Sequence, residues 1–194
     1  MGNRRLGRKR LYTIEKAGAT VDPGAGAGIE PAIIRTTQHR VGQELITEIL
    51  VDLGTSKAAI TTSGTGGNGD RSPIGVNGKL AKVTQLTAAK YGIITEIRAV
   101  LTEAIAGGVA VGLEHGANGD ATVNTGTPAV DGGARVQLIE DLDTVGEDTS
   151  ATINDNSAAD KYLYIVQEAN DTAAAYTGGK IAIYIYGFAV PSDL

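Results

Sequence analysis

Short aliphatic runs separated by glycine, asparagine and aspartate divide the chain from residue 32 onward. Short strands that alternate with regularly spaced turn signals are typical of an all-β domain. Asn-Gly pairs beginning at residues 68, 77 and 118 favour hairpins, because both central residues of a type I′ turn need positive φ. The expected strands are Ala32–Thr37, Glu44–Leu53, Ala58–Thr62, Lys79–Thr87, Gly92–Thr102, Val109–Leu113, Ala134–Leu142, Lys161–Glu168 and Gly179–Ala189. The sequence therefore predicts a single antiparallel body, either a β-sandwich or a jelly-roll or barrel-like domain.

The strand near the C-terminus has the clearest pattern. Ile181, Ile183 and Ile185 point to one face, and the other face carries Ala182, Tyr184, Tyr186 and Phe188. A strand that is apolar on both faces is expected in the middle of a sheet. The stretch from Gly92 to Ile105 also fits a helical stripe, but its many β-branched residues favour a strand.

The composition excludes several kinds of chemistry. The chain has no Cys, which removes disulfides, thiolate catalysis and cysteine zinc sites. His39 and His115 lie in no recognisable motif, and both are expected to be surface or turn residues. No Gly-x-Ser-x-Gly sequence is present to position a nucleophile. The sequence thus predicts a protein that is not an enzyme and that has no catalytic, cofactor or metal residues.

An acidic run begins within the end of the expected strand Ala134–Leu142 and continues beyond it. It contains Glu140, Asp141, Asp143, Glu147 and Asp148. Runs of this kind are usually solvated loops or strand edges. Calcium binding at residues 140–148 stays open, because oxygen ligands are the kind that calcium takes.

Charge is unevenly distributed along the chain. Residues 1–16 hold six basic residues and one acidic residue, a net charge of +5, and the remainder holds 11 basic and 21 acidic residues, a net charge of −10. Residues 17–31 are rich in glycine and poor in large apolar residues, so they are expected to form an extended linker that buries little. The predicted organisation is an arm with linker, residues 1–31, and a β-rich body, residues 32–194.

The basic arm is either a frayed terminus or a docking element. Nucleic acid is disfavoured as its partner, since the acidic body would repel phosphate and Tyr12 is the arm's only aromatic residue. An acidic protein surface suits it better. The residues expected to dock are Arg4, Arg5, Leu6, Arg8, Lys9, Arg10, Leu11 and Tyr12.

Most of the aromatic residues lie in the last part of the sequence. Tyr162, Tyr164, Tyr184 and Tyr186 are expected to lie in the core or in an oligomer contact, where tyrosine adds area and one hydrogen bond. A ligand face that stacks sugars is the alternative. No stretch is long and apolar enough to predict a membrane helix.

Several segments resemble the virion structural proteins of tailed bacteriophages, especially marine ones. They are DKYLYI at 160–165, AYTGGK at 175–180, IAIYIYG at 181–187, KVTQLT at 82–87, IITEI at 93–97 and the hairpin at Gly107-Gly108. The resemblance covers residues 45–189 and marks strands and turns. It implies a capsid decoration, or cement, protein that binds the major capsid protein and forms a homo-oligomer, with a trimer favoured. The alternatives are a tail- or fibre-associated domain of the virion, or a carbohydrate-binding module.

Overall fold

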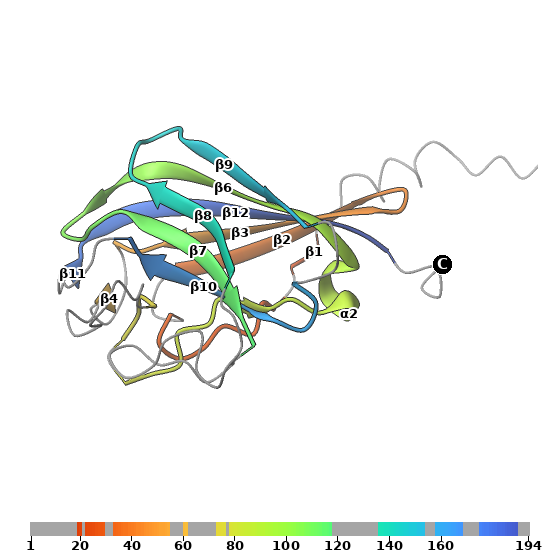
Figure 1. The fold of residues 1–194 in the computed structure, drawn as a ribbon, viewed down its shortest axis with the longest axis horizontal. Coiled ribbons are helices and arrows are strands. Elements are labelled where there is room, and N and C mark those ends of the chain that lie inside the picture. The colour runs from red at the N-terminus through yellow and green to blue at the C-terminus, as the bar shows by residue number, and fades with distance from the viewer. Residues whose placement is uncertain are drawn as a thin grey trace, which may run out of the picture.

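The computed structural model describes residues 19–20, 22–29, 33–54, 60–61, 73–76, 78–117, 136–153, 158–168 and 175–189. They form an all-β, sandwich-like body in which two antiparallel sheets pack together (Figure 1). This confirms the predicted fold class and favours the sandwich among its variants.

The larger sheet has six strands. In spatial order they are β1 (Ala19–Thr20), β2 (Ile33–Val41), β3 (Glu44–Asp52), β12 (Gly178–Phe188), β6 (Ile93–Ala106) and β9 (Asp148–Thr152). The smaller sheet has four strands, in the order β5 (Thr84–Gln85), β10 (Tyr162–Gln167), β7 (Val111–Gly116) and β8 (Val136–Leu142). A two-stranded pair joins β11 (Ala175–Tyr176) to β4 (Ile60–Thr61), and the helix α2 spans Ala88–Tyr91.

Strand β12 lies inside the larger sheet, between β3 and β6, as its sequence predicts. Its isoleucines face the smaller sheet and are buried. The core between the sheets includes Ile49, Val51, Ile97, Leu101, Ile181, Ile183 and Ile185 from the larger sheet and Val111, Leu113, Ile139, Leu142, Leu163 and Ile165 from the smaller one. Burying a side chain of this size contributes about 1.5–3 kcal/mol, so these contacts are the main source of stability.

The structure corrects the expected strands at several points. Only Thr84–Gln85 of the expected strand Lys79–Thr87 forms a ladder, because Thr87 already precedes the helix α2. The strand β9 was missed, since Asp148–Thr152 has no large apolar residue. It forms at the sheet edge because β6 offers it a partner strand there. The ambiguous stretch after Gly92 is the long strand β6, as predicted.

The glycine-rich segment before β2 packs into the body, so the prediction that it buries little is wrong for residues 22–29. Ile29 is fully buried in the core. The amides of Gly26 and Gly28 donate to the carbonyls of Lys82 and Leu80 at 2.8 and 2.7 Å. A Cβ at Gly26 or Gly28 would lie 2.3 or 2.6 Å from the Leu80 carbonyl oxygen. Glycine is therefore needed here for close backbone approach.

Two further glycines share a positive φ but have different surroundings. Gly42 opens the turn between β2 and β3 with φ of 64°, and no atom lies within 4 Å of a Cβ built on it. Gly92 ends α2 with φ of 68°, and its Cβ would lie 2.1 Å from the carbonyl oxygen of Phe188. Both positions disfavour an L side chain, but only Gly92 holds α2 against β12.

Gly92→Ala is predicted to destabilise the protein much more than Gly42→Ala. Gly42→Ala adds only the backbone cost of the left-handed region, about 1–2 kcal/mol. Gly92→Ala adds a clash with the backbone of β12, which costs about 1–3 kcal/mol more. Urea denaturation of both variants measures the difference. Equal losses of unfolding free energy would contradict the close contact between α2 and β12.

Two buried tyrosines connect peripheral segments to the body. The Tyr91 hydroxyl lies 2.7 Å from Thr84 Oγ1, and Thr84 Oγ1 donates to the Pro23 carbonyl at 2.7 Å. The Tyr176 hydroxyl donates to the Val109 carbonyl at 3.2 Å. Burial raises the pKa of both phenols, because a phenolate in the interior loses its hydration.

Stability is predicted to fall above about pH 10, where tyrosines of the unfolded chain ionise. A pKa that is raised in the folded state means that the folded protein holds the proton more tightly. The stabilisation is therefore complete below pH 10 and is lost as pH rises toward the folded pKa. Absorbance of tyrosinate at 295 nm, followed as pH rises, should show a late phase in which the buried tyrosines ionise at higher pH than exposed ones. This phase should coincide with loss of the circular dichroism signal. Tyr91→Phe should lower the amplitude of that late phase, and reversible ionisation of all tyrosines in a native protein would refute the prediction.

Candidate functional site

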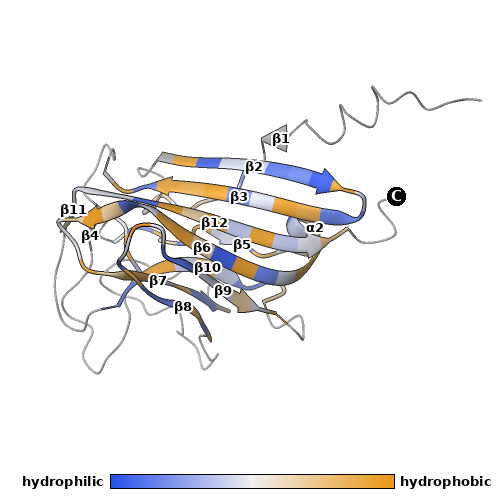
Figure 2. Cartoon of the chain, turned by 90° about the horizontal axis from the view of Figure 1, so that it is seen from above, coloured by the Kyte–Doolittle hydropathy of each residue, from blue (hydrophilic) through white to orange (hydrophobic). Residues whose placement is uncertain are grey.

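The outer face of the six-stranded sheet, which points away from the smaller sheet, gathers aromatic and charged side chains. Along β12 it carries Tyr184, Tyr186 and Phe188, because these alternate with the buried isoleucines. The register places Tyr186 between Ile46 and Glu96, and Phe188 between Glu44 and Ile93. Figure 2 shows polar and apolar residues interspersed along β2, β3 and β12. This face is the candidate site, because its aromatic side chains lie among charged ones and are not covered like the core.

One end of the outer face carries a row of partly exposed side chains that are apolar except for Glu44. Ile93 pairs with Phe188, Phe188 pairs with Glu44, and Glu44 pairs with Val41. Val41 is 53% exposed, Ile93 49% and Phe188 47%. Large apolar side chains that stay half in water as neighbours favour a contact with another molecule.

Tyr184 sits at the centre of a polar group on this face. Its hydroxyl donates to Glu48 Oε1 at 3.3 Å, and the hydroxyl of Thr37 donates to Glu48 Oε2 at 3.3 Å. The Arg98 guanidinium lies 5.9 Å from the Tyr184 ring centre, within the range of a cation–π contact. Partial burial, followed by the negative charge of Glu48, raises the pKa of Tyr184.

The charged side chains at the other end of the face are paired. Arg98 binds both carboxylate oxygens of Asp148, and this hydrogen bonding lowers the pKa of Asp148 and raises that of Arg98. Lys180 binds Glu103, which raises the lysine pKa, and lies 3.7 Å from an oxygen of Asp52. Exposed pairs of this kind contribute little stability.

The four tyrosines expected in the core or in an oligomer contact lie on two different sheets. Tyr184 and Tyr186 are half-buried on the outer face of the larger sheet. Tyr162 and Tyr164 belong to β10 and point away from the core on the smaller sheet. Tyr164 is fully buried with Ala81 and Val166. Tyr162 is half-buried, with the Lys82 ammonium 4.9 Å from its ring centre.

The residues expected to form the docking arm lie outside the described residues. These are Arg4, Arg5, Leu6, Arg8, Lys9, Arg10, Leu11 and Tyr12. The structure therefore provides the surface that the arm could contact, and the arm's own role stays a prediction.

The prediction that His115 is a surface or turn residue is wrong, whereas His39 is a partly exposed strand residue and not a turn residue. His115 is only 1% exposed and lies in β7, and His39 lies within β2. The period-two series Val111, Leu113 and His115 is the signal that could have placed His115 on a strand. Glu114 and Gln167, on β7 and β10, are also buried, and sequence analysis gave no sign of either.

The acidic run at 140–148 forms the end of β8, a turn and the start of β9. In the turn, Glu147 Oε2 accepts hydrogen bonds from the amides of Asp143 and Thr144 at 3.2 and 3.4 Å. Glu147 therefore has a structural role as a turn residue. Within the described part of the chain, no group of three or more acidic or histidine side chains is arranged to hold a metal ion.

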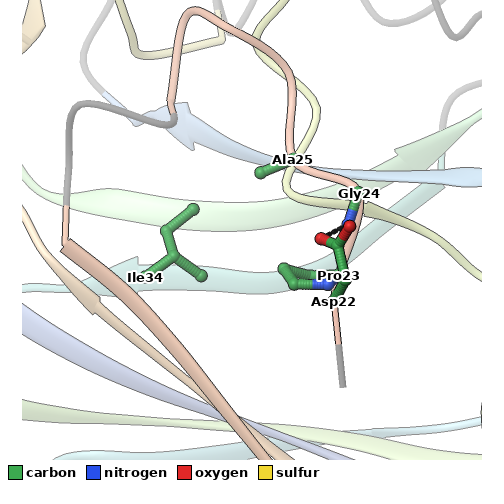
Figure 3. A pocket seen from close by; sticks show the side chains of 5 residues that line it. All are labelled: Asp22, Pro23, Gly24, Ala25 and Ile34. Carbon is green, nitrogen blue, oxygen red and sulfur yellow. Dashed lines mark hydrogen bonds between the residues drawn. The ribbon is translucent and has the colours of Figure 1, made fainter. Parts of the chain in front are cut away.

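A surface hollow of about 300 Å³ lies beside the glycine-rich segment. It is lined by Asp22, Pro23, Gly24, Ala25 and Ile34 (Figure 3). The Asp22 carboxylate already accepts a hydrogen bond from the Gly24 amide at 2.8 Å. This bond fixes the turn at Pro23, so the carboxylate is best explained as a local backbone contact.

Comparisons with models of protein families, with curated proteins and with solved structures found no match to this chain. Among the described residues, no helix has the length and apolar character needed to cross a membrane. The candidate site is therefore interpreted from its own geometry.

Tyr164→Ala is predicted to cost more stability than Tyr184→Ala. Removing a fully buried aromatic ring costs about 3–5 kcal/mol. Tyr184 leaves part of its surface in water, so its loss should cost about 1–2 kcal/mol. Urea denaturation of the two variants tests this order. A larger loss for Tyr184→Ala would mean that the outer face is part of the folding core.

Proposed function

We propose that the chain is a non-enzymatic structural protein of a virus particle, most specifically a decoration protein that binds and stabilises the shell of major capsid protein. The proposal starts from the resemblance of residues 45–189 to virion proteins of tailed bacteriophages. It includes a homo-oligomeric state, with a trimer as the first expectation. The alternative position in the particle is the tail or a fibre, where the same kind of body would serve.

The observation that carries the proposal is the half-exposed aromatic and aliphatic face on a packed β-sandwich. Tyr184, Tyr186 and Phe188 alternate with isoleucines on the strand β12, and exposed Ile93 lies opposite Phe188, with exposed Val41 at the same end of the face. Aromatic residues are enriched where proteins bind one another. A decoration protein needs such a surface together with a body that does not deform.

Charge separation gives further support. The arm of net charge +5 and the remainder of net charge −10 attract each other between neighbouring subunits. Sixteen extended residues span about 55 Å at most, enough to cross a subunit boundary. Because each exposed ion pair contributes about 0–1 kcal/mol, several basic residues have to act together.

A carbohydrate-binding module has less support. Sugar stacking requires accessible tyrosine rings, and Tyr164 is fully buried. The Tyr184 ring is already in contact with the Arg98 guanidinium.

The arm is predicted to be required for binding to particle heads. Two full-length proteins are compared: the natural chain, and a chain in which residues 2–16 are replaced by a neutral Gly/Ser sequence of the same length. Both are mixed with heads that lack the protein and are sedimented at low and high salt. The natural chain should sediment with heads, less so at high salt, and the neutral-arm chain should have clearly lower occupancy.

Circular dichroism of both chains serves as the control for folding. Equal occupancy of the two chains at every salt concentration would show that the arm is only a frayed terminus. Failure of the natural chain to bind heads at all would overturn the proposed function.

A further inference from the structure

The outer face has a defined acidic and aromatic region, here called the Glu–Tyr region. It consists of Glu44 and Glu48 on β3, Glu96 on β6, and Tyr184, Tyr186 and Phe188 on β12. The cross-strand register brings them together: Phe188 is opposite Glu44, Tyr186 is opposite Glu96, and Tyr184 is opposite Glu48. Each aromatic residue on the central strand therefore has a carboxylate beside it.

The charge of the Glu–Tyr region is negative. On the neighbouring strand β6, the guanidinium of Arg98 lies opposite Tyr184. Arg98 is already bound to Asp148, so its charge is largely compensated. A ligand of this region should therefore be cationic.

The region also shows how it would bind a cation. Arg98 lies over the Tyr184 ring at 5.9 Å, and arginine stacks well on aromatic faces because its guanidinium is planar and weakly hydrated. Tyr186 and Phe188 offer two more rings on the same strand. Exposed Ile93 and Val41 lie at the end of the same face and suit apolar side chains. An arginine-rich segment that also contains leucine or tyrosine matches all of these features.

The chain itself contains such a segment in its first residues. Within residues 4–12 the sequence RRLGRKRLY combines five basic side chains with two leucines and a tyrosine. Extended over nine residues, it spans about 30 Å, similar to the length of the eleven-residue strand β12. The fit between the two is one of charge, side-chain type and length.

The direction of β1 favours a neighbour over the same chain. Ala19 pairs with Gln38 and Thr20 with Thr37, antiparallel to β2. In this register the N-terminal end of β1 points toward the end of β2 at Val41, along the edge of the sheet. Because β1 is an edge strand and β2 and β3 separate it from β12, the arm begins at the side of the sheet that a neighbouring copy can approach.

We propose that the Glu–Tyr region is the docking site for the basic arm, residues 1–16, of a second copy of this chain. The inference rests on the proposed function and specifies it, since it identifies the neighbouring subunit that the arm binds. Copies on a shell would then be linked to one another as well as to the shell.

Substitutions that reverse the charge of the face, of the arm or of both test whether the arm docks on the Glu–Tyr region. The experiment uses the purified full-length protein without any shell. The face variant carries Glu44→Lys and Glu96→Lys, which leaves Glu48 and its hydrogen bonds intact. The arm variant carries Arg4→Glu, Arg5→Glu and Arg8→Glu. A matched control carries Glu140→Lys and Asp143→Lys, which adds the same charge at the exposed end of β8 and in the turn that follows it. Sedimentation velocity over a range of concentrations gives the association constants.

We expect the face variant and the arm variant each to weaken association about tenfold or more, and the control to leave it nearly unchanged. A chain that carries both sets of substitutions should associate again, because its acidic arm meets a basic face. Equal weakening in the control would overturn the proposal in favour of non-specific charge attraction. Failure of the combined chain to associate, with circular dichroism of a folded protein, would also overturn it.

Zero-length carbodiimide cross-linking distinguishes an arm that docks on a neighbouring molecule from an arm that docks on its own chain. An equal mixture of ¹⁴N- and ¹⁵N-labelled protein is cross-linked, and peptides that join Lys9 to Glu44, Glu48 or Glu96 are identified by mass spectrometry. Peptides of mixed isotope composition are expected. Peptides of uniform isotope composition only would show that each arm folds back on its own face, and absence of these peptides would show that the face is not the receptor. Because no shell is present, either failure leaves head binding to be judged separately.

Discussion

The pairing of β12 with β3 on one side and β6 on the other is the interaction on which the rest of the body depends. It connects the last described strand to a strand that lies more than a hundred residues earlier in the sequence. The isoleucines of β12 then cover the smaller sheet and complete the core. Since these are non-local contacts, the sheet cannot close until nearly the whole chain is available.

The same pairing determines what the protein presents outward. Side chains of a strand alternate between faces, so burying Ile181, Ile183 and Ile185 requires Tyr184, Tyr186 and Phe188 to point away from the core. The ladder also fixes their neighbours, because Glu44, Glu48 and Glu96 are the register partners of these aromatics. The acidic aromatic surface is thus a direct consequence of how the core is built.

The glycine-rich segment shows how the edge of the sandwich is closed. Gly26 and Gly28 come close enough to the backbone of residues 80–82 to form hydrogen bonds with it, and Ile29 enters the core. Lys90 Nζ donates to the Pro23 carbonyl at 3.0 Å, which connects the same segment to α2. Residues 22–29 are therefore held on the body by hydrogen bonds and by the burial of Ile29. An arm docked on a neighbour would be connected to the folded body through this fixed segment.

The sequence by itself determined the all-β class, the central position of Lys180–Phe188 and the separation of charge between the first residues and the rest, because these follow from period-two alternation and composition. It predicted the tyrosines as core or contact residues but could not assign Tyr162 and Tyr184 to different sheets, because a strand pattern does not identify its partner strand.

Sequence analysis missed the burial of Ile29, His115 and Glu114 and the strand β9, since polar or glycine-rich segments become ordered only through neighbours that are distant in sequence. The grouping of Glu44, Glu48 and Glu96 around the β12 aromatics was decided by tertiary structure alone, because register between β3, β12 and β6 exists only once the sheet has formed.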